Sequence, residues 1–243
     1  MKILSIGNSF SQDAQRYLHR IAQADGIDLT TINLMIGGCQ LSRHYRNMLS
    51  ETPAYGLEMN GDPTGFPVSL KEALLNREWD VITIQQASHQ STDYTTYQPY
   101  LNKLVEYIRM CAPQAKLLIQ QTWAYEQGSA RLTEKMGYTD QMDMYHDLKK
   151  AYSLAMKDAH IDGIIPSGTL FQALLSSGVE KIHRDTFHAS LGLGRYALGL
   201  LWYRVLTGKS IQDNTFQNFD EPISPEEIAL AKNTVDEVYK KYC

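Results

Sequence analysis

Short apolar segments alternate with amphipathic stretches along nearly the whole chain, and this alternation is the feature that most limits the possible folds. Strand-like segments that alternate with helix-like ones predict a parallel sheet with helices on both faces. The expected strands are residues 2–6, 28–36, 80–85, 115–120 and 161–165, and the expected helices are residues 12–24, 97–111, 140–159, 191–206 and 225–242. We therefore expect an α/β protein with a five-stranded parallel sheet.

Size and composition are those of one globular domain spanning residues 1–243. Hydrophobic residues make up 43% of the chain and charged residues 21%, which is enough apolar material for a substantial core. The formal net charge of -4 offers no electrostatic reason to expect nucleic acid or an anionic membrane as a partner.

The cysteines and the N-terminus bear on the compartment. Cys39, Cys111 and Cys243 are odd in number and widely spaced, so they fit neither a disulfide framework nor a zinc ribbon. Met1 leads directly into the first strand and leaves no room for a signal peptide. We expect a cytoplasmic protein with reduced thiols, or a secreted one if the chain has been trimmed.

Several polar or glycine-rich turns directly follow the expected strands. Ligands of an open parallel sheet bind outside the carboxyl ends of its strands, so these turns are where a site is expected. The segments 52–67, 87–96 and 122–139 are also long for connections in a compact domain, and long loops are commonly functional.

The turn after the first strand reads IGNSFS and contains Ser9. A serine at this position has two interpretations. It is a favoured cap for the following helix, and it could instead be a nucleophile presented at the end of a strand. The motif alone favours the cap.

A second polar cluster, HRDTFHAS, lies near the other end of the chain. Asp185 and His188 are three residues apart, so the carboxylate can reach the Nδ1–H of the imidazole. A base oriented in this way is what a serine hydroxyl needs to become a nucleophile. A structural pair at a loop–helix junction is the alternative explanation of these two residues.

The combination of both clusters resembles the SGNH (GDSL-like) hydrolase superfamily. The blocks IGNSFS, GGCQLSRH, IQQASHQS and DTFHASLGLGRYALGLLWYRVLTG more narrowly resemble an uncharacterised bacterial SGNH-like group known as a domain of unknown function. The resemblance implies a three-layer α/β/α flavodoxin-like fold and ester hydrolysis. It also implies that Ser9 is the nucleophile, His188 the base and Asp185 its orienter.

The same resemblance implies three donors that hold the oxyanion: the N–H of Ser9, a glycine N–H after the second strand and an amide side chain after the third. Gly38 is the expected glycine, although Gly-Gly could simply be a turn. The superfamily's Gly-x-Asn-Asp block is replaced by ITIQQASHQS, where we expect Gln86 to be the third donor, with Ser88 and His89 as alternatives.

We expect the substrate to contact Asn8, His89 and Trp123. Trp123 belongs to a group of loop aromatics that could stack on sugar rings, together with Tyr94, Tyr97 and Tyr125, although ordinary packing explains such residues equally well.

Two other chemistries are less favoured. His183, Asp185 and His188 could bind a metal, but no second cluster of ligands accompanies them, and we expect no metal and no cofactor. Cys39 could be a thiol nucleophile, but a small buried residue is the more common role of a cysteine.

The sequence thus predicts a serine esterase that hydrolyses a small acyl ester, preferably acetyl, on a small molecule or carbohydrate through an acyl-Ser9 intermediate. The alternatives are a catalytically impaired carbohydrate-binding module and an acyltransferase that uses the same Ser9–His188 pair.

Overall fold

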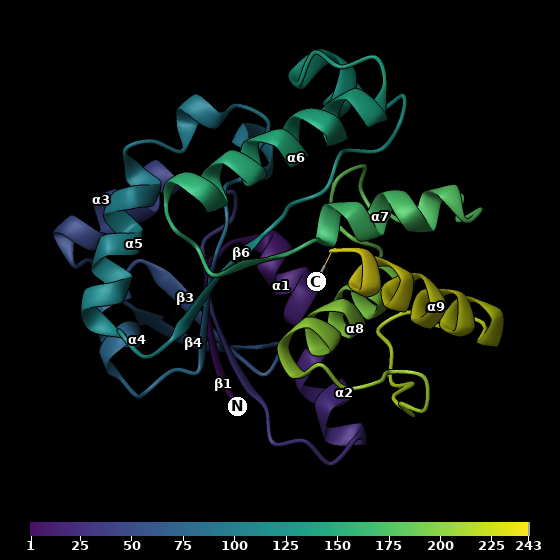
Figure 1. Ribbon diagram of the computed structural model, residues 1–243, viewed down its shortest axis with the longest axis horizontal. Coiled ribbons are helices and arrows are strands. Elements are labelled where there is room, and N and C mark those ends of the chain that lie inside the picture. Colours follow the sequence, from purple (N-terminus) through teal and green to yellow (C-terminus); the bar gives the residue numbers. More distant parts are fainter. Residues whose placement is uncertain (243) are drawn as a thin grey trace.

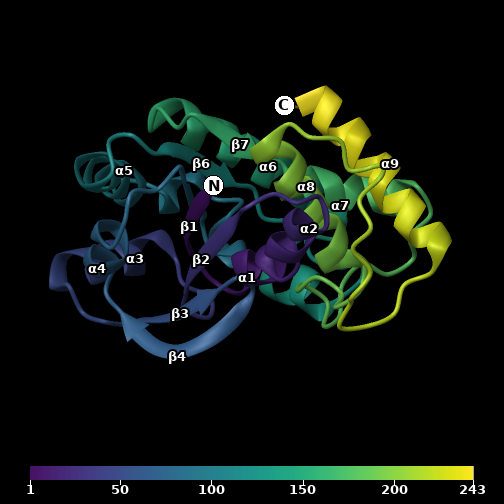
Figure 2. The same cartoon turned by 90° about the horizontal axis from the view of Figure 1, so that it is seen from below.

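The computed structural model describes residues 1–242, which form a central sheet of seven strands flanked by helices (Figures 1 and 2). The strand order is β4-β3-β2-β1-β5-β6-β7. All five expected strands are present, and they run parallel to one another. They are β1 (Lys2–Gly7), β2 (Thr30–Met35), β5 (Val81–Ile84), β6 (Lys116–Gln120) and β7 (Gly163–Ile165).

The expected count of five strands is wrong, because residues 52–67 are not simply a loop. They contain the antiparallel strands β3 (Tyr55–Met59) and β4 (Asp62–Val68), which extend the sheet beyond β2. Asn60 and Gly61 form the tight turn with φ of 55° and 87°, and Asn-Gly is the sequence signal that this hairpin offered. β4 carries two prolines and is mostly exposed, as an edge strand can be (Figure 2).

Two layers of helices cover the sheet (Figure 1). On one side lie α3 (Leu41–Ser50), α4 (Leu70–Leu75) and α5 (Tyr100–Cys111), which pack on one another. On the other side α8 (Leu193–Thr207) contacts α1 (Ser9–Gln15), α2 (Leu18–Ala24), α7 (Ser167–Ser176) and α9 (Pro225–Tyr242). α6 (Gln141–Asp158) packs against α7. The single helix expected over residues 12–24 is therefore two short helices.

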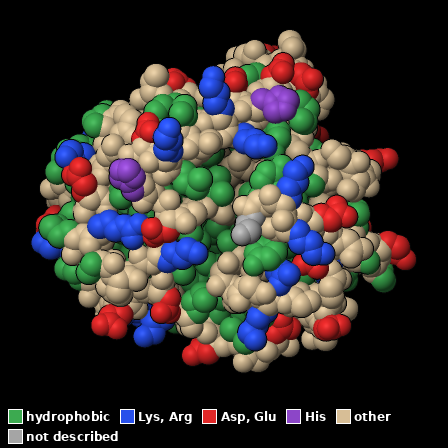
Figure 3. Space-filling view, in the orientation of Figure 1, with side chains coloured by type: hydrophobic (Ala, Val, Ile, Leu, Met, Phe, Trp, Pro, Cys, Tyr) green, Lys and Arg blue, Asp and Glu red, His purple; other side chains and the backbone are tan. Residues whose placement is uncertain are grey.

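The charged surface is mixed. Figure 3 shows Lys and Arg side chains interspersed with Asp and Glu over the face that it presents, in keeping with a small net charge. Within residues 1–242, no helix combines the length and the apolar character needed to cross a bilayer.

A buried carboxylate joins α1 to the C-terminal part of the chain. Asp13 is fully buried, and its oxygens accept hydrogen bonds from Arg184 Nη1 at 2.9 and 3.0 Å. They also accept from Arg195 Nε at 2.9 Å and from the backbone N–H of Ala189 at 3.1 Å. Asp13 therefore holds both the loop of residues 184–189 and the first turn of α8 against α1.

Two buried histidines are held neutral. Burial lowers the pKa of His44, which stacks on Tyr55 between α3 and β3, to about 3. Burial likewise lowers the pKa of His183 to about 4, although its Nε2 lies 3.1 Å from the carbonyl of Ala124. Protonating either ring would put a charge in the interior, so the folded state opposes it.

We expect Asp13→Asn to destabilise the fold, because it leaves the Arg184 guanidinium without its counter-charge and Arg195 with Asp220 as its remaining partner. The expected loss is about 3 kcal/mol, or a fall of roughly 5–12 °C in Tm by thermal melting. Asp62→Asn is the matched control, since Asp62 also meets two arginines but its side chain is 54% exposed. Its Tm should change by no more than about 3 °C. Equal shifts for the two variants would contradict the structural role of Asp13.

Stability should fall with acidification below about pH 6.5. The unfolded chain protonates His44 and His183 near the ordinary pKa of 6.5, while their folded pKa values are about 3 and 4, so the unfolded state binds more protons throughout this window. Each histidine should cost about 2 kcal/mol between pH 7 and pH 5. In melts over this range, His44→Gln should show a shallower decline in Tm than the wild type. The exposed His146→Gln should match the wild-type slope, and an unchanged slope for His44→Gln would refute the assignment.

Candidate active site

Ser9 is the first residue of α1, but it does not cap that helix. The N-cap is Asn8, whose Oδ1 accepts a hydrogen bond from Phe10 N at 3.0 Å. The same oxygen accepts from Gln85 Nε2 at 2.6 Å, and Asn8 Nδ2 donates to the carbonyl of Cys39 at 3.1 Å. The capping role that Ser9 could have had is thus filled by its neighbour, which leaves the Ser9 hydroxyl available.

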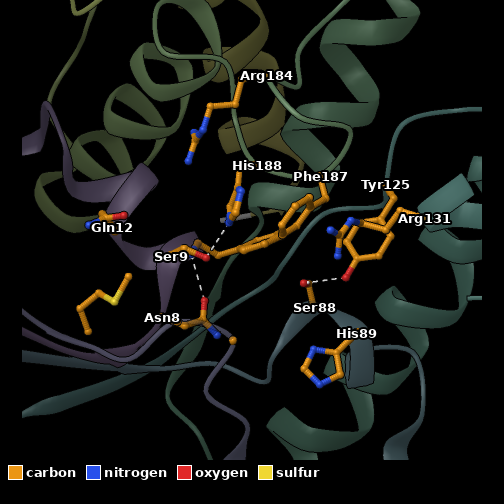
Figure 4. A pocket seen from close by; sticks show the side chains of 14 residues that line it. Asn8, Ser9, Gln12, Ser88, His89, Tyr125, Arg131, Arg184, Phe187 and His188 are labelled. Atoms are coloured by element: carbon orange, nitrogen blue, oxygen red, sulfur yellow. Dashed lines mark hydrogen bonds between the residues drawn. The ribbon is translucent and has the colours of Figure 1, made fainter. Parts of the chain in front are cut away.

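The structure brings Ser9, His188 and Asp185 into one hydrogen-bonded series, drawn in part in Figure 4. Ser9 Oγ lies 2.8 Å from His188 Nε2, and His188 Nδ1 lies 2.8 Å from Asp185 Oδ2. A carboxylate only accepts, so Nδ1 carries the proton and Nε2 is the acceptor for the Ser9 hydroxyl. This is the tautomer that a general base requires.

Asp185 is bound to His188 twice, since the backbone N–H of His188 also donates to its Oδ1 at 2.9 Å. Burial raises the pKa of Asp185, but the hydrogen bonds from the His188 side chain and backbone outweigh it and leave the pKa below its usual value. Asp185 therefore stays ionised near neutral pH and can hold the Nδ1–H of His188.

Aromatic packing fixes the loop that carries His188. The Phe187 ring lies 3.8 Å from the His188 ring between centroids, and the Phe187 carbonyl accepts a hydrogen bond from Trp123 Nε1 at 2.7 Å. Trp123 itself is fully buried and stacks on Phe10 and Phe171. The expectation that Trp123 contacts substrate is therefore wrong: its ring is enclosed by the core and supports the His188 loop from behind.

Two residues of the pocket lining have backbone N–H groups without a partner within residues 1–242. Ser9 and Gly38 both line the pocket, and the N–H of neither is bonded to any residue in the described part of the chain. Gly38 has a φ of 60°, a left-handed conformation that favours glycine, and its turn is exposed. These two N–H groups are free to stabilise an oxyanion.

Gln86 is not a third donor, and this expectation is also wrong. Its side chain is fully buried, its Oε1 accepts from the N–H groups of Leu41 and Ala87, and its Nε2 donates to Thr96. Since every hydrogen-bonding atom is used to join α3 to the segment after β5, none faces the pocket. The neighbouring Ser88 and His89, which follow in the same block, line the pocket instead.

The pocket around Ser9 has a volume of about 480 Å³ and contains residues that sequence patterns did not single out (Figure 4). Gln12, Met35, Arg131, Arg184 and Phe187 line it together with the expected Asn8 and His89. Asn8 reaches the pocket wall, but both atoms of its amide are already bonded, so it positions Ser9 rather than offering a free contact. Arg131 belongs to no motif, and Arg184, although it lies within HRDTFHAS, was assigned no role from the sequence.

The less favoured chemistries find no support here. His183 is buried with Nε2 directed at a backbone carbonyl, so it does not join Asp185 and His188 as a set of ligands. Burial raises the pKa of the Cys39 thiol to about 12, so it stays protonated and is a poor nucleophile. Tyr97 is fully buried, and Tyr94 Oη donates to Asp158, so of the loop tyrosines only Tyr125 lines the pocket.

Solved structures similar to this chain share its fold. A lipase/acylhydrolase from Enterococcus faecalis matches with a TM-score of 0.55 at 16% identity, over 85% of this chain and 95% of that one. A candidate SGNH hydrolase from Slackia heliotrinireducens matches with a TM-score of 0.62 at 22% identity, over 85% and 98% of the two chains. A candidate GDSL-like lipase from Parabacteroides merdae matches with a TM-score of 0.55 at 15% identity, over 85% of this chain and 95% of that one. The fold is thus that of SGNH and GDSL-like hydrolases, as the sequence blocks predicted.

One similar structure is much nearer in sequence. A DUF4886 family protein from Bacteroides uniformis matches with a TM-score of 0.91 and 36% identity, over 98% of this chain and 94% of that chain. No similar sequence was found among curated proteins. Residues 2–238 match the family described as "Domain of unknown function (DUF4886)", and the chain belongs to this family.

Proposed function

We propose that the protein is a serine esterase that cleaves small acyl esters through an acyl-Ser9 intermediate. The observation that carries this proposal is the hydrogen-bonded series from Ser9 Oγ through the His188 imidazole to Asp185. The series opens into a pocket that also presents two unbonded N–H groups, those of Ser9 and Gly38.

The reaction has two halves. His188 Nε2 takes the proton of Ser9 as Oγ attacks the ester carbonyl, and the resulting oxyanion is held by the N–H groups of Ser9 and Gly38. His188 then returns the proton to the departing alcohol oxygen, which leaves acyl-Ser9. A water molecule attacks that ester while His188 takes its proton, and collapse of the second oxyanion releases the carboxylic acid and returns the proton to Ser9.

We propose that Ser88 supplies the third oxyanion donor in place of Gln86. Ser88 Oγ lies 2.9 Å from Tyr125 Oη, and both residues line the pocket. Burial raises the pKa of Tyr125, and the hydrogen bond with Ser88 only partly offsets this, so the phenol stays protonated. Tyr125 can then donate to Ser88 Oγ, which leaves the serine proton free to point at the oxyanion.

A short acyl group suits this pocket better than a long one. Its volume is within the range of small-molecule sites, and the apolar side chains that line it are few, chiefly Phe10, Met35 and Phe187. A long acyl chain would need an extended apolar groove. An acetyl ester of a carbohydrate is the substrate class that we favour, with Tyr125 and Phe187 as aromatic surfaces for a sugar ring.

Hydrolysis of p-nitrophenyl acetate tests the esterase directly. The wild type should turn it over, and Ser9→Ala should lose at least roughly 1,000-fold in kcat. A fluorophosphonate probe should label the wild type on the peptide that contains Ser9 and leave Ser9→Ala unlabelled. Ser177→Ala, at an exposed serine after α7, is the control and should keep full activity. No turnover and no labelling would favour the binding module, and acetylated alcohol formed in place of acetate would favour the acyltransferase.

Replacing Ser88 with alanine should slow the reaction by roughly 10- to 100-fold in kcat, because one donor to the transition state is lost. Tyr125→Phe should show a smaller loss in the same direction, since Ser88 remains but is no longer oriented. Steady-state kinetics with p-nitrophenyl acetate measure both effects. If His89→Ala is slower than Ser88→Ala, the donor is His89 and the assignment of Ser88 is wrong.

A further inference from the structure

The pocket around Ser9 is positively charged in a protein whose net charge is negative. Its lining contains two arginines and two histidines, and no Asp or Glu is among the residues that the structure assigns to it. The negative net charge of -4 therefore resides elsewhere on the molecule. An ester with a neutral alcohol part would form no ion pair with these positive side chains.

One of the two arginines is already neutralised. Arg184 Nη1 donates to both carboxylate oxygens of Asp13, which is fully buried behind the pocket wall. It also donates to the carbonyl of Ala189. The charge of Arg184 is thus balanced within the protein, and its role is to position the loop that carries His188.

Arg131 differs from Arg184 because its charge has no partner. Its guanidinium forms no ion pair and donates no side-chain hydrogen bond to any residue within 1–242. It lies 3.7 Å above the Phe187 ring and 6.0 Å from the Tyr125 ring. Figure 4 shows it beside these two rings, across the pocket from Gln12. All five N–H donors of a half-buried guanidinium therefore remain available to a ligand.

The position of Arg131 is fixed by its surroundings. It begins the short helical turn 131–135, whose next residue, Leu132, is fully buried and anchors the turn in the core. The Phe187 ring on which the guanidinium packs also contacts the His188 ring. Arg131 and His188 thus both contact Phe187 and both line the pocket that contains Ser9.

The positive charge of Arg131 also acts on His89, another residue of the pocket lining. Burial lowers the pKa of His89, and the positive charge of Arg131 lowers it further. His89 is then neutral near pH 7, which leaves Arg131 as the main uncompensated charge facing a ligand.

We propose that Arg131 binds an anionic group, a carboxylate or a sulfate, on the alcohol part of the ester. This inference rests on the proposed esterase function, because a small acyl group leaves only the alcohol part to reach Arg131. The planar guanidinium matches both kinds of anion with two parallel hydrogen bonds. Acylated acidic sugars are the natural class of substrate with this chemistry.

Three acetyl esters test the inference: neutral methyl 4-acetoxybenzoate, 4-acetoxybenzoate and 4-acetoxybenzenesulfonate. The kcat/KM of each ester is divided by its rate constant for hydrolysis by hydroxide, which removes differences in intrinsic reactivity. By this measure the wild type should favour at least one anionic ester over the neutral ester. Arg131→Gln should lose at least about tenfold more activity on that anion than on the neutral ester. Lys135→Gln removes a positive charge from the exposed end of the same turn and should keep the wild-type preference. The two anionic esters separate a carboxylate site from a sulfate site.

A binding measurement separates this inference from the esterase proposal. In calorimetry with the Ser9→Ala protein, 4-acetoxybenzoate or its sulfonate counterpart should bind at least about tenfold more tightly than the methyl ester, and Ser9→Ala/Arg131→Gln should lose the difference. Anion binding of this kind without turnover by the wild type would support the anion site and overturn the esterase. Ser9-dependent turnover without any anion preference would overturn the anion site alone. Equal losses on all three esters in Arg131→Gln, with a lower Tm, would show that Arg131 only packs against Phe187 and would also overturn it.

Discussion

The contact on which the site depends most is the buried carboxylate of Asp13. Ser9 and His188 are 179 residues apart, and bringing them within hydrogen-bonding distance requires that α1 and the loop before α8 be locked together. Asp13 lies one helical turn beyond Ser9 and binds Arg184 and the N–H of Ala189, which flank His188 on either side. The interaction is strong because the carboxylate is removed from water and each of its oxygens is bonded. Ordering this junction before any ligand arrives lets the base meet the nucleophile without a further entropic cost.

A second junction, at Asn8, connects the ends of three strands. Its amide meets the carbonyl of Cys39, next to Gly38, and the side chain of Gln85 at the end of β5. These contacts set the nucleophile, the glycine donor and the segment of Ser88 at fixed positions relative to one another. The amides of Gln85 and Gln86 are both used in such joints, which explains why neither is left to contact a substrate. Of the polar side chains after β5, Gln85 and Gln86 therefore hold neighbouring segments together, whereas Ser88 and His89 line the pocket.

The proposed reaction places negative charge at two points of the pocket. An oxyanion near Ser9 and an anionic group near Arg131 both call for donors and positive charge, while the ionised Asp185 lies behind His188 and is not part of the lining. Phe187 separates the two regions and contacts both His188 and Arg131. Asp185 is bonded to His188 and Arg131 packs on Phe187, so the two charges have different neighbours.

The sequence by itself determined the alternation of strands and helices, because apolar periodicity is a local property, and all five parallel strands follow from it. It also identified Asp185 and His188, whose spacing lets them bond within one turn of chain, and Ser9, whose turn follows the first strand. Tertiary structure decided what depends on distant partners. The β3–β4 hairpin joins the sheet because β3 pairs with β2, Trp123 is enclosed by the core, and the Gln86 amide is bonded to Leu41 and Thr96. Arg131 lies beside Phe187, 56 residues away, and the hydrogen bonding of a side chain can be known only when every group around it is in place.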